Sequence, residues 1–173
     1  MNIDADYDTL PLDVANDCNQ ELIRAFNIFG TVGIVNGVKV DNEQVTGNTF
    51  AAYDPKTFTI LLRSDRNRAD VARAMRKAGK GYFSTRSHLH PYRHEFGHAL
   101  WEYLKRLDAD FVGRMSKMYD VYFEECRNGK KTVASECSET DALEMFSEAI
   151  ADLMDRNPSA RSTMIIDKSE QRY

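Results

Sequence analysis

Residues 90–107 read HPYRHEFGHALWEYLKRL, and the helix that this stretch predicts decides the fold. Apolar residues recur along it at helical spacing, which is typical of an amphipathic helix that covers a core. Pro91 lies near the first helical position, where its missing N–H group costs nothing. His94 and His98 stand four residues apart, so their imidazoles project from the same side of the helix. The rest of the chain must pack around a helix that carries two adjacent histidines.

The five residues HEFGH, 94–98, form the pattern H-E-x-x-H, which on a helix is typical of a zinc site with its own base. Glu95, about 100° further round the helix, would point towards a water molecule on the metal. Gly97 costs about 1 kcal/mol relative to alanine in a helix interior, which indicates the close approach of a strand or a substrate. His88 and His90 precede the regular helix, and we expect His90 to cap it rather than bind metal. The motif predicts Zn²⁺ and hydrolysis.

Two histidines leave a catalytic zinc site incomplete, because such sites usually have three protein ligands. The metzincin motif would place glycine at 101 and histidine at 104, but Trp101 and Leu104 stand there, so that class is excluded. Further along, residues 144–152 read EMFSEAIAD and place three carboxylates at spacing four on one helical face. These carboxylates form either a solvated acidic stripe or the source of the missing ligand. The small residues beside them favour close packing on the histidine helix.

The motif HEFGH, followed by EMFSEAIADLM at 144–154, resembles the gluzincin metallopeptidases. It is most similar to the branch that contains anthrax lethal factor, the Pro-Pro endopeptidases and zincin-like domains attached to phage head proteins. The resemblance covers about residues 80–156 and implies a zinc metalloendopeptidase that acts on a peptide or protein. It implies that Glu144 is the third zinc ligand and that Glu148 holds a zinc histidine in place, since a ligating imidazole needs an acceptor for its other N–H. The E-x-x-x-D form of thermolysin-like gluzincins would instead make Glu148 the ligand and Asp152 its partner; we prefer Glu144.

One position departs from this family pattern. The lethal-factor branch has a tyrosine seven residues before the ligand glutamate, where it donates to the developing oxyanion, and this chain has Cys137. A thiol donates only weakly, whereas a thiolate could itself bind zinc and close the open position. Tyr92, Tyr119 and Tyr122 are candidates to replace the phenol, and the interpretation that we favour for Cys137 is a small buried residue. The alternative for the protein as a whole is a catalytically weak or inactive zinc-stabilised binding or structural module of a phage or mobile-element protein.

The remaining pattern predicts an α+β fold with a small N-terminal β-sheet and a mainly helical C-terminal half. We expect a single zincin-like domain over 1–156 and a loosely held polar tail over 157–173. Helices are expected over 11–29, 68–78, 90–107, 108–127 and 140–156, and β-structure over 31–40, 49–53 and 57–62. Asn36-Gly37 predicts a hairpin turn, and the strand over 57–62 is a candidate edge for an extended peptide.

Composition narrows the class of protein. A length of 173 residues with 42% hydrophobic residues suits one domain with a real core. The net charge of −4 gives no general attraction to nucleic acid, and we interpret the arginines and lysines over 63–86 as a solvated helix face. The first residues, MNIDADYDTL, contain no signal peptide, and no apolar run is long enough to span a membrane. Three widely spaced cysteines predict reduced thiols, so we expect a soluble, cytoplasmic protein.

Overall fold

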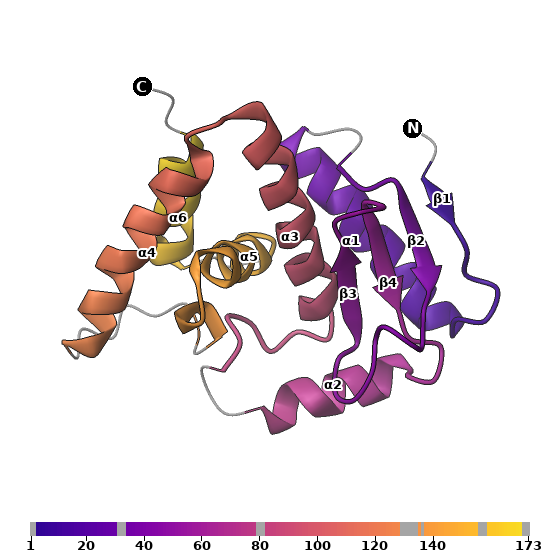
Figure 1. Ribbon diagram of the computed structural model, residues 1–173. Helices are drawn as coiled ribbons and strands as arrows, with labels where there is room; N and C mark the ends of the chain where they lie inside the picture. The colour runs from indigo at the N-terminus through magenta and orange to yellow at the C-terminus, as the bar shows by residue number, and fades with distance from the viewer. Residues whose placement is uncertain are drawn as a thin grey trace.

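The computed structural model describes residues 3–30, 34–78, 82–128, 135, 137–155 and 159–170. Its elements, in chain order, are β1 (Asp4–Ala5), α1 (Leu12–Phe29), β2 (Gly37–Val40), β3 (Ala51–Asp54), β4 (Thr59–Leu62), α2 (Arg68–Lys77), α3 (His90–Leu107), α4 (Phe111–Arg127), a short 3-10 helix (Cys137–Glu139), α5 (Ala142–Leu153) and α6 (Ala160–Glu170). The strands gather in the N-terminal half and helices make up most of the remainder (Figure 1). The predicted α+β class is confirmed at this level.

The four strands form one sheet in the order β1-β2-β4-β3. β2 is parallel to both β1 and β4, whereas β3 runs antiparallel to β4 after the turn that contains Pro55. α1 lies behind the sheet in the view of Figure 1 and ends at Gly30, whose φ of 61° suits glycine. β3 is thus an edge strand, and it is the strand that contacts α3.

The hairpin expected at Asn36-Gly37 is wrong. β2 begins at Gly37, and its partners β1 and β4 come from distant parts of the chain. Asn36 joins these partners, because its N–H donates to the Phe58 carbonyl at 2.8 Å and its carbonyl accepts from the Asp4 N–H at 3.0 Å. A Cβ at position 37 would lie 2.8 Å from the Asp4 carbonyl oxygen, so glycine is needed here for strand approach. Residues 31–33 of the expected β-structure lie outside the described residues.

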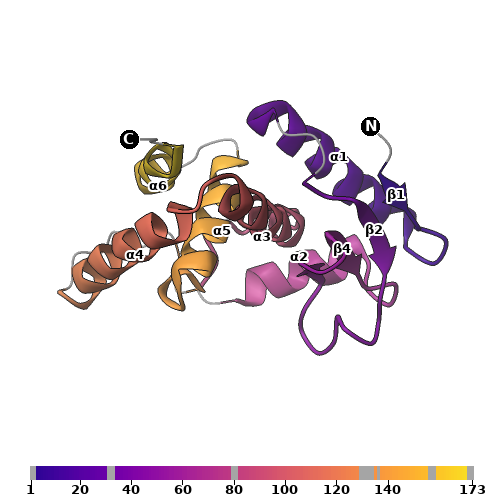
Figure 2. The ribbon, with the colours of Figure 1, turned by 45° about the horizontal axis from the view of Figure 1, so that its top comes forward.

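α3 lies between the sheet and the other helices of the C-terminal half (Figures 1 and 2). On one side Phe96 packs against Phe26 and Phe29 of α1, with ring centroids 6.0 and 5.7 Å away. On the other side, edge-on contacts among Trp101, Phe111 and Phe146 join α3, α4 and α5. α3 is therefore fixed from both sides.

The contact between α3 and α5 explains Gly97. A Cβ at this position would lie 2.6 Å from the Ser147 Cα, closer than the two helix backbones could tolerate. The close approach expected from the sequence is real, but a helix makes it rather than a strand or a substrate. All residues from Met145 to Asp152 are buried, so this part of α5 is enclosed, whereas its first turn is only partly buried.

Residues 160–170 differ from the loose tail expected after position 156. They form α6, which packs on α5 and places Ile165 and Ile166 in the core. The Asp152 side chain of α5 accepts from the Ser159 N–H, just before α6, at 2.7 Å. Across the part of the chain that the structure describes, none of the helices has the length and apolarity to cross a membrane.

Candidate metal centre

The start of α5 fixes the position of Glu144. The Asp141 side chain caps the helix by accepting from the Glu144 N–H at 2.9 Å, which places Glu144 in the first turn. The Gly97–Ser147 contact then brings the Glu144 and Glu148 side chains against the histidine-bearing side of α3. Two helices distant in sequence thus supply one group of imidazoles and carboxylates.

His94, His98 and Glu144 turn their polar atoms towards one point. The two Nε2 atoms are 3.0 Å apart, and the Glu144 oxygens lie 3.1 Å from His94 Nε2 and 3.5 Å from His98 Nε2. In a tetrahedral zinc site with bonds of about 2.0–2.1 Å, ligand atoms are separated by about 3.3 Å. The three separations are close to this value, with Glu144 Oε2 nearest His94 and Glu144 Oε1 nearest His98.

The other ring nitrogens of these histidines face α5. His98 Nδ1 lies 3.3 Å from Ser147 Oγ. His94 Nδ1 lies 2.9 Å from Glu148 Oε1, an ion-pair contact without an in-line N–H···O angle. The Glu148 carboxylate favours a proton on His94 Nδ1, which leaves His94 Nε2 turned to the other side. The Ser147 hydroxyl can donate to His98 Nδ1 or accept from it, so this contact orients the ring without selecting a tautomer.

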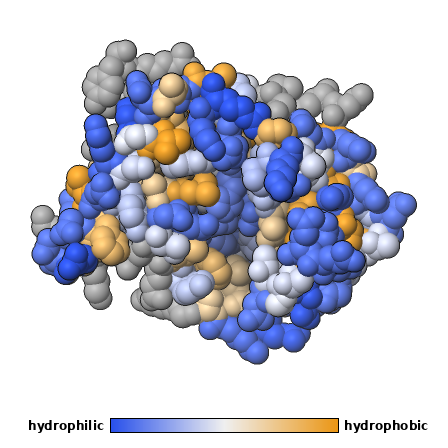
Figure 3. Space-filling view, viewed as in Figure 1, coloured by the Kyte–Doolittle hydropathy of each residue, from blue (hydrophilic) through white to orange (hydrophobic). Residues whose placement is uncertain are grey.

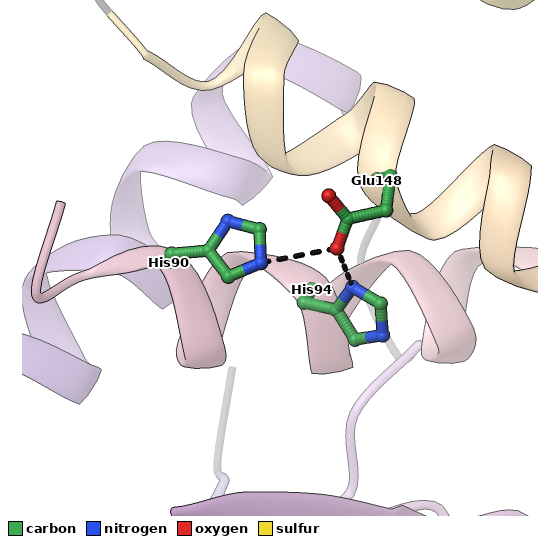
Figure 4. A group of neighbouring side chains, drawn as sticks. All are labelled: His90, His94 and Glu148. Carbon is green, nitrogen blue, oxygen red and sulfur yellow. Dashed lines mark hydrogen bonds and ion pairs between the residues drawn. The ribbon is translucent and has the colours of Figure 1, made fainter. Parts of the chain in front are cut away.

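Among the described residues, two groups have single ligand atoms that all lie close enough to hold a metal ion, one of His94, Glu95 and His98 and one of His90, His94 and Glu148 (Figure 4). In the second group a single oxygen, Glu148 Oε1, lies 3.1 Å from His90 Nε2 and 2.9 Å from His94 Nδ1. The other oxygen accepts from the Ser84 N–H at 2.6 Å. In this second group the Glu148 oxygens already contact the Ser84 N–H and His90 Nε2, whereas in the first group the two Nε2 atoms face each other beside the Glu144 carboxylate. A cation suits the first group better.

Titration of the first group supports the same conclusion. Burial lowers the pKa of His94, but Glu144 and Glu148 outweigh it and raise the pKa to about 10. Burial and the charge of His94 lower the pKa of His98 to about 4. At neutral pH His94 is therefore protonated and His98 is neutral, so two adjacent imidazoles carry one positive charge beside Glu144.

Glu95 stands beside this group. Its carboxylate and the ring nitrogens of His94 and His98 lie within 4.8 Å of one another. Burial raises the pKa of Glu95 to about 7, although His94 and the Tyr53 backbone N–H act in the opposite direction. A carboxyl group with this pKa can exchange a proton near neutral pH.

The site opens into a groove along β3. One cavity of about 600 Å³ runs from His94 and Glu95 towards Ala74 and Phe83. A second, of about 400 Å³, runs from the same two residues towards His98 and Leu143. Figure 3 shows this face of the molecule hollowed over α3, between α5 and β3. The expected peptide edge at 57–62 is wrong in position, since β4 is an inner strand and β3 forms the edge.

Cys137 lies at this groove as well. It lines the larger cavity, and its thiol donates towards Glu144 Oε2 at 3.5 Å. None of the tyrosines considered as replacements lines either cavity. Tyr122 Oη is paired with Ser138 Oγ at 2.6 Å, Tyr119 stacks on Phe123, and Tyr92 is buried. Tyr53 and Tyr82 do line the cavities, one each.

His90 is the site residue that the sequence interpretation missed. The helix is capped at Leu89 without a side-chain hydrogen bond, so the capping role expected for His90 is wrong. His90 is instead the first residue of α3, buried, with Nε2 on Glu148. The available signal was the spacing of four that links positions 90, 94 and 98. Asp152 accepts from the Ser159 N–H ahead of α6 and so differs from the partner role that the alternative gave it. Glu148, the ligand in that alternative, lies close enough to His90 and His94 to hold a metal ion with them.

Compared with models of known protein families, with curated proteins and with solved structures, the chain matches none of them. The geometry of the side chains is therefore the basis for any functional proposal.

Proposed function

We propose that this protein is a zinc-dependent endopeptidase of the gluzincin type, built on a zincin-like α+β domain. One observation carries the proposal. The His94 and His98 Nε2 atoms and the Glu144 carboxylate face one point at separations of 3.0, 3.1 and 3.5 Å, with Glu95 beside them.

Each residue of the site has a separate role in the proposed reaction. His94, His98 and Glu144 would hold Zn²⁺, and Glu148 and Ser147 keep the two imidazoles oriented. Bound zinc supplies Lewis acidity, which acidifies a water molecule towards a pKa of about 7 and polarises a substrate carbonyl. Glu95 takes the proton from the attacking water and passes it to the leaving amine. The pKa of about 7 that burial gives Glu95 suits both transfers.

The groove favours an internal peptide bond as the target. Both cavities contain His94, Glu95 and Ala51, so space for substrate lies on both sides of the reacting centre. β3 pairs only with β4 among the described residues, and the part of its free edge around Ala51 lines both cavities. An extended peptide can add to such an edge by main-chain hydrogen bonds.

Cys137 supports a second candidate, a zinc-stabilised binding or structural module, as in a phage or mobile-element protein, with little or no catalysis. The thiol stands where the family resemblance expects a phenol, and the lining tyrosines come from other elements. Loss of one oxyanion donor costs about 2.7–4 kcal/mol in comparable enzymes. This module would bind zinc stoichiometrically without cleaving peptides.

Zinc content and peptide-library cleavage, measured for wild type, Glu95→Gln and Glu102→Gln, test the proposal. Glu102 lies on the same helix and lines the smaller cavity, but it pairs with Lys105 and so controls for lost charge. All three proteins should bind one zinc ion, and only Glu95→Gln should lose cleavage, by about 10²–10⁴-fold. Undiminished cleavage by Glu95→Gln removes the assigned base. Zinc without cleavage in the wild type favours the structural module.

A further inference from the structure

His90 is buried and has contacts on three sides. The proposed reaction assigns no role to this residue. Its Nε2 lies 3.1 Å from Glu148 Oε1 and its Nδ1 lies 3.4 Å from Thr85 Oγ1. The Phe83 ring packs against the imidazole with centroids 4.8 Å apart. His90 is 1% exposed, so these contacts leave it one orientation.

Glu148 connects His90 to His94, because one of its oxygens contacts both imidazoles (Figure 4). Its Oε2 accepts from the Ser84 N–H at 2.6 Å, and its Oε1 faces both imidazoles. The terminal torsion of a glutamate is otherwise broad. Contacts on both oxygens fix the plane of this carboxylate, and the plane fixes where His94 Nδ1 can point.

We propose that His90 is a positioning residue of the metal centre, which through Glu148 holds the His94 imidazole with Nε2 turned towards the metal. The inference rests on the proposed function, because it requires metal at His94 Nε2. It makes α3 carry three functional histidines at spacing four, of which two bind metal and the first acts through Glu148. In the competing account, His90 and Glu148 form a buried pair that stabilises the fold and does not affect metal binding.

The zinc dissociation constant, measured by competition with a chelating dye, separates the two accounts. His90→Phe keeps a ring of similar shape against Phe83 but removes both nitrogens. His90→Gln keeps an amide N–H that can reach Glu148. His88→Phe is the matched control, since His88 is partly exposed and contacts Asp17. Unfolding of each protein in excess chelator gives the stability without metal.

The expected result is a 10–100-fold weaker zinc affinity for His90→Phe, as for loss of other partners that orient a metal-binding histidine. His90→Gln should stay within about threefold of wild type, because it retains the hydrogen bond, and His88→Phe should be unchanged. Equal affinity in His90→Phe and wild type overturns the inference, whatever the unfolding data show. So does an equal loss in His90→Gln and His90→Phe, which would indicate ring packing.

Two further outcomes are distinguishable. If His90→Phe does not fold, Thr85→Val removes only the His90 Nδ1 partner, and a weaker zinc affinity in that variant supports the inference while an unchanged one opposes it. If wild type binds no zinc, the proposed function itself fails. If wild type binds zinc and cleaves peptides while His90→Phe keeps full affinity, only the role of His90 fails.

Discussion

Two groups of the same composition, each with two histidines and one glutamate, meet at the His94 ring. The His90 and Glu148 side chains are 2% and 0% exposed, and the Glu148 oxygens contact His90 Nε2 and the Ser84 N–H. The His98 and Glu144 side chains are 16% and 23% exposed and lie at the groove, where two imidazole nitrogens converge. Residue type alone therefore does not identify a metal site. We propose that the partly exposed group at the groove binds the metal and that the buried group supports it.

The largest effects are expected from the removal of Glu144 or Glu148. The first substitution should mainly weaken zinc binding, and the second should mainly destabilise the zinc-free protein. Glu144→Ala should weaken zinc binding by more than about 100-fold, since a ligand is lost rather than its partner, with zinc-free stability changed by less than about 1 kcal/mol. Glu148→Ala should destabilise the zinc-free protein by about 3–5 kcal/mol, because His90 and the Ser84 N–H lose a buried charged partner. Dye competition and urea unfolding in chelator measure both quantities. Identical profiles for the two variants would contradict the distinction.

Gly97 determines how closely α5 carries both glutamates to α3. Gly97→Ala should destabilise the protein by about 1–3 kcal/mol, because the new Cβ meets the Ser147 backbone at 2.6 Å. Gly113→Ala is the matched control, since a Cβ there has nothing within 4 Å and alanine should stabilise α4 by about 0.5–1 kcal/mol. Unfolding in urea measures both. A Gly97→Ala protein as stable as Gly113→Ala would exclude the close helix contact.

The pH dependence of zinc binding sharpens the same comparison. The carboxylates raise the pKa of His94 from 6.5 to about 10, so its contribution to zinc-free stability is complete below about pH 6.5 and is lost as pH rises towards 10. Zinc must displace this proton, whereas His98, with a pKa lowered to about 4, is already neutral. Apparent zinc affinity should therefore rise about tenfold per pH unit between about pH 6 and 8. Affinity that is flat across this range in dye competition would show that no proton is displaced.

The helices and the metal-binding pattern were readable from the sequence because their signals are local. The bounds of α3 follow from periodicity and Pro91, and the spacing of His94 and His98 fixes their common side. Glu144 followed from the family resemblance, and the structure brings it to these histidines. What remained uncertain was which acidic residue of α5 stands nearest the imidazoles, since that depends on how two distant helices cross.

The errors concern contacts that sequence spacing does not encode. Asn36-Gly37 has the composition of a hairpin turn, but parallel pairing with β1 and β4 is a long-range arrangement. The polar composition after position 156 concealed α6, which places Ile165 and Ile166 in the core. The sequence places His90 at the start of the helix, and this position predicts a cap. Its partner Glu148 lies 58 residues away and cannot be inferred from local spacing.

The location of zinc in crystals of the zinc-loaded protein, found by anomalous scattering at the zinc edge, tests the central claim most directly. We predict one peak about 2.0–2.2 Å from His94 Nε2, His98 Nε2 and a Glu144 oxygen, with Glu148 outside bonding distance on the far side of His94. A peak between His90 Nε2, His94 Nδ1 and Glu148, or no peak at α3, would contradict the account.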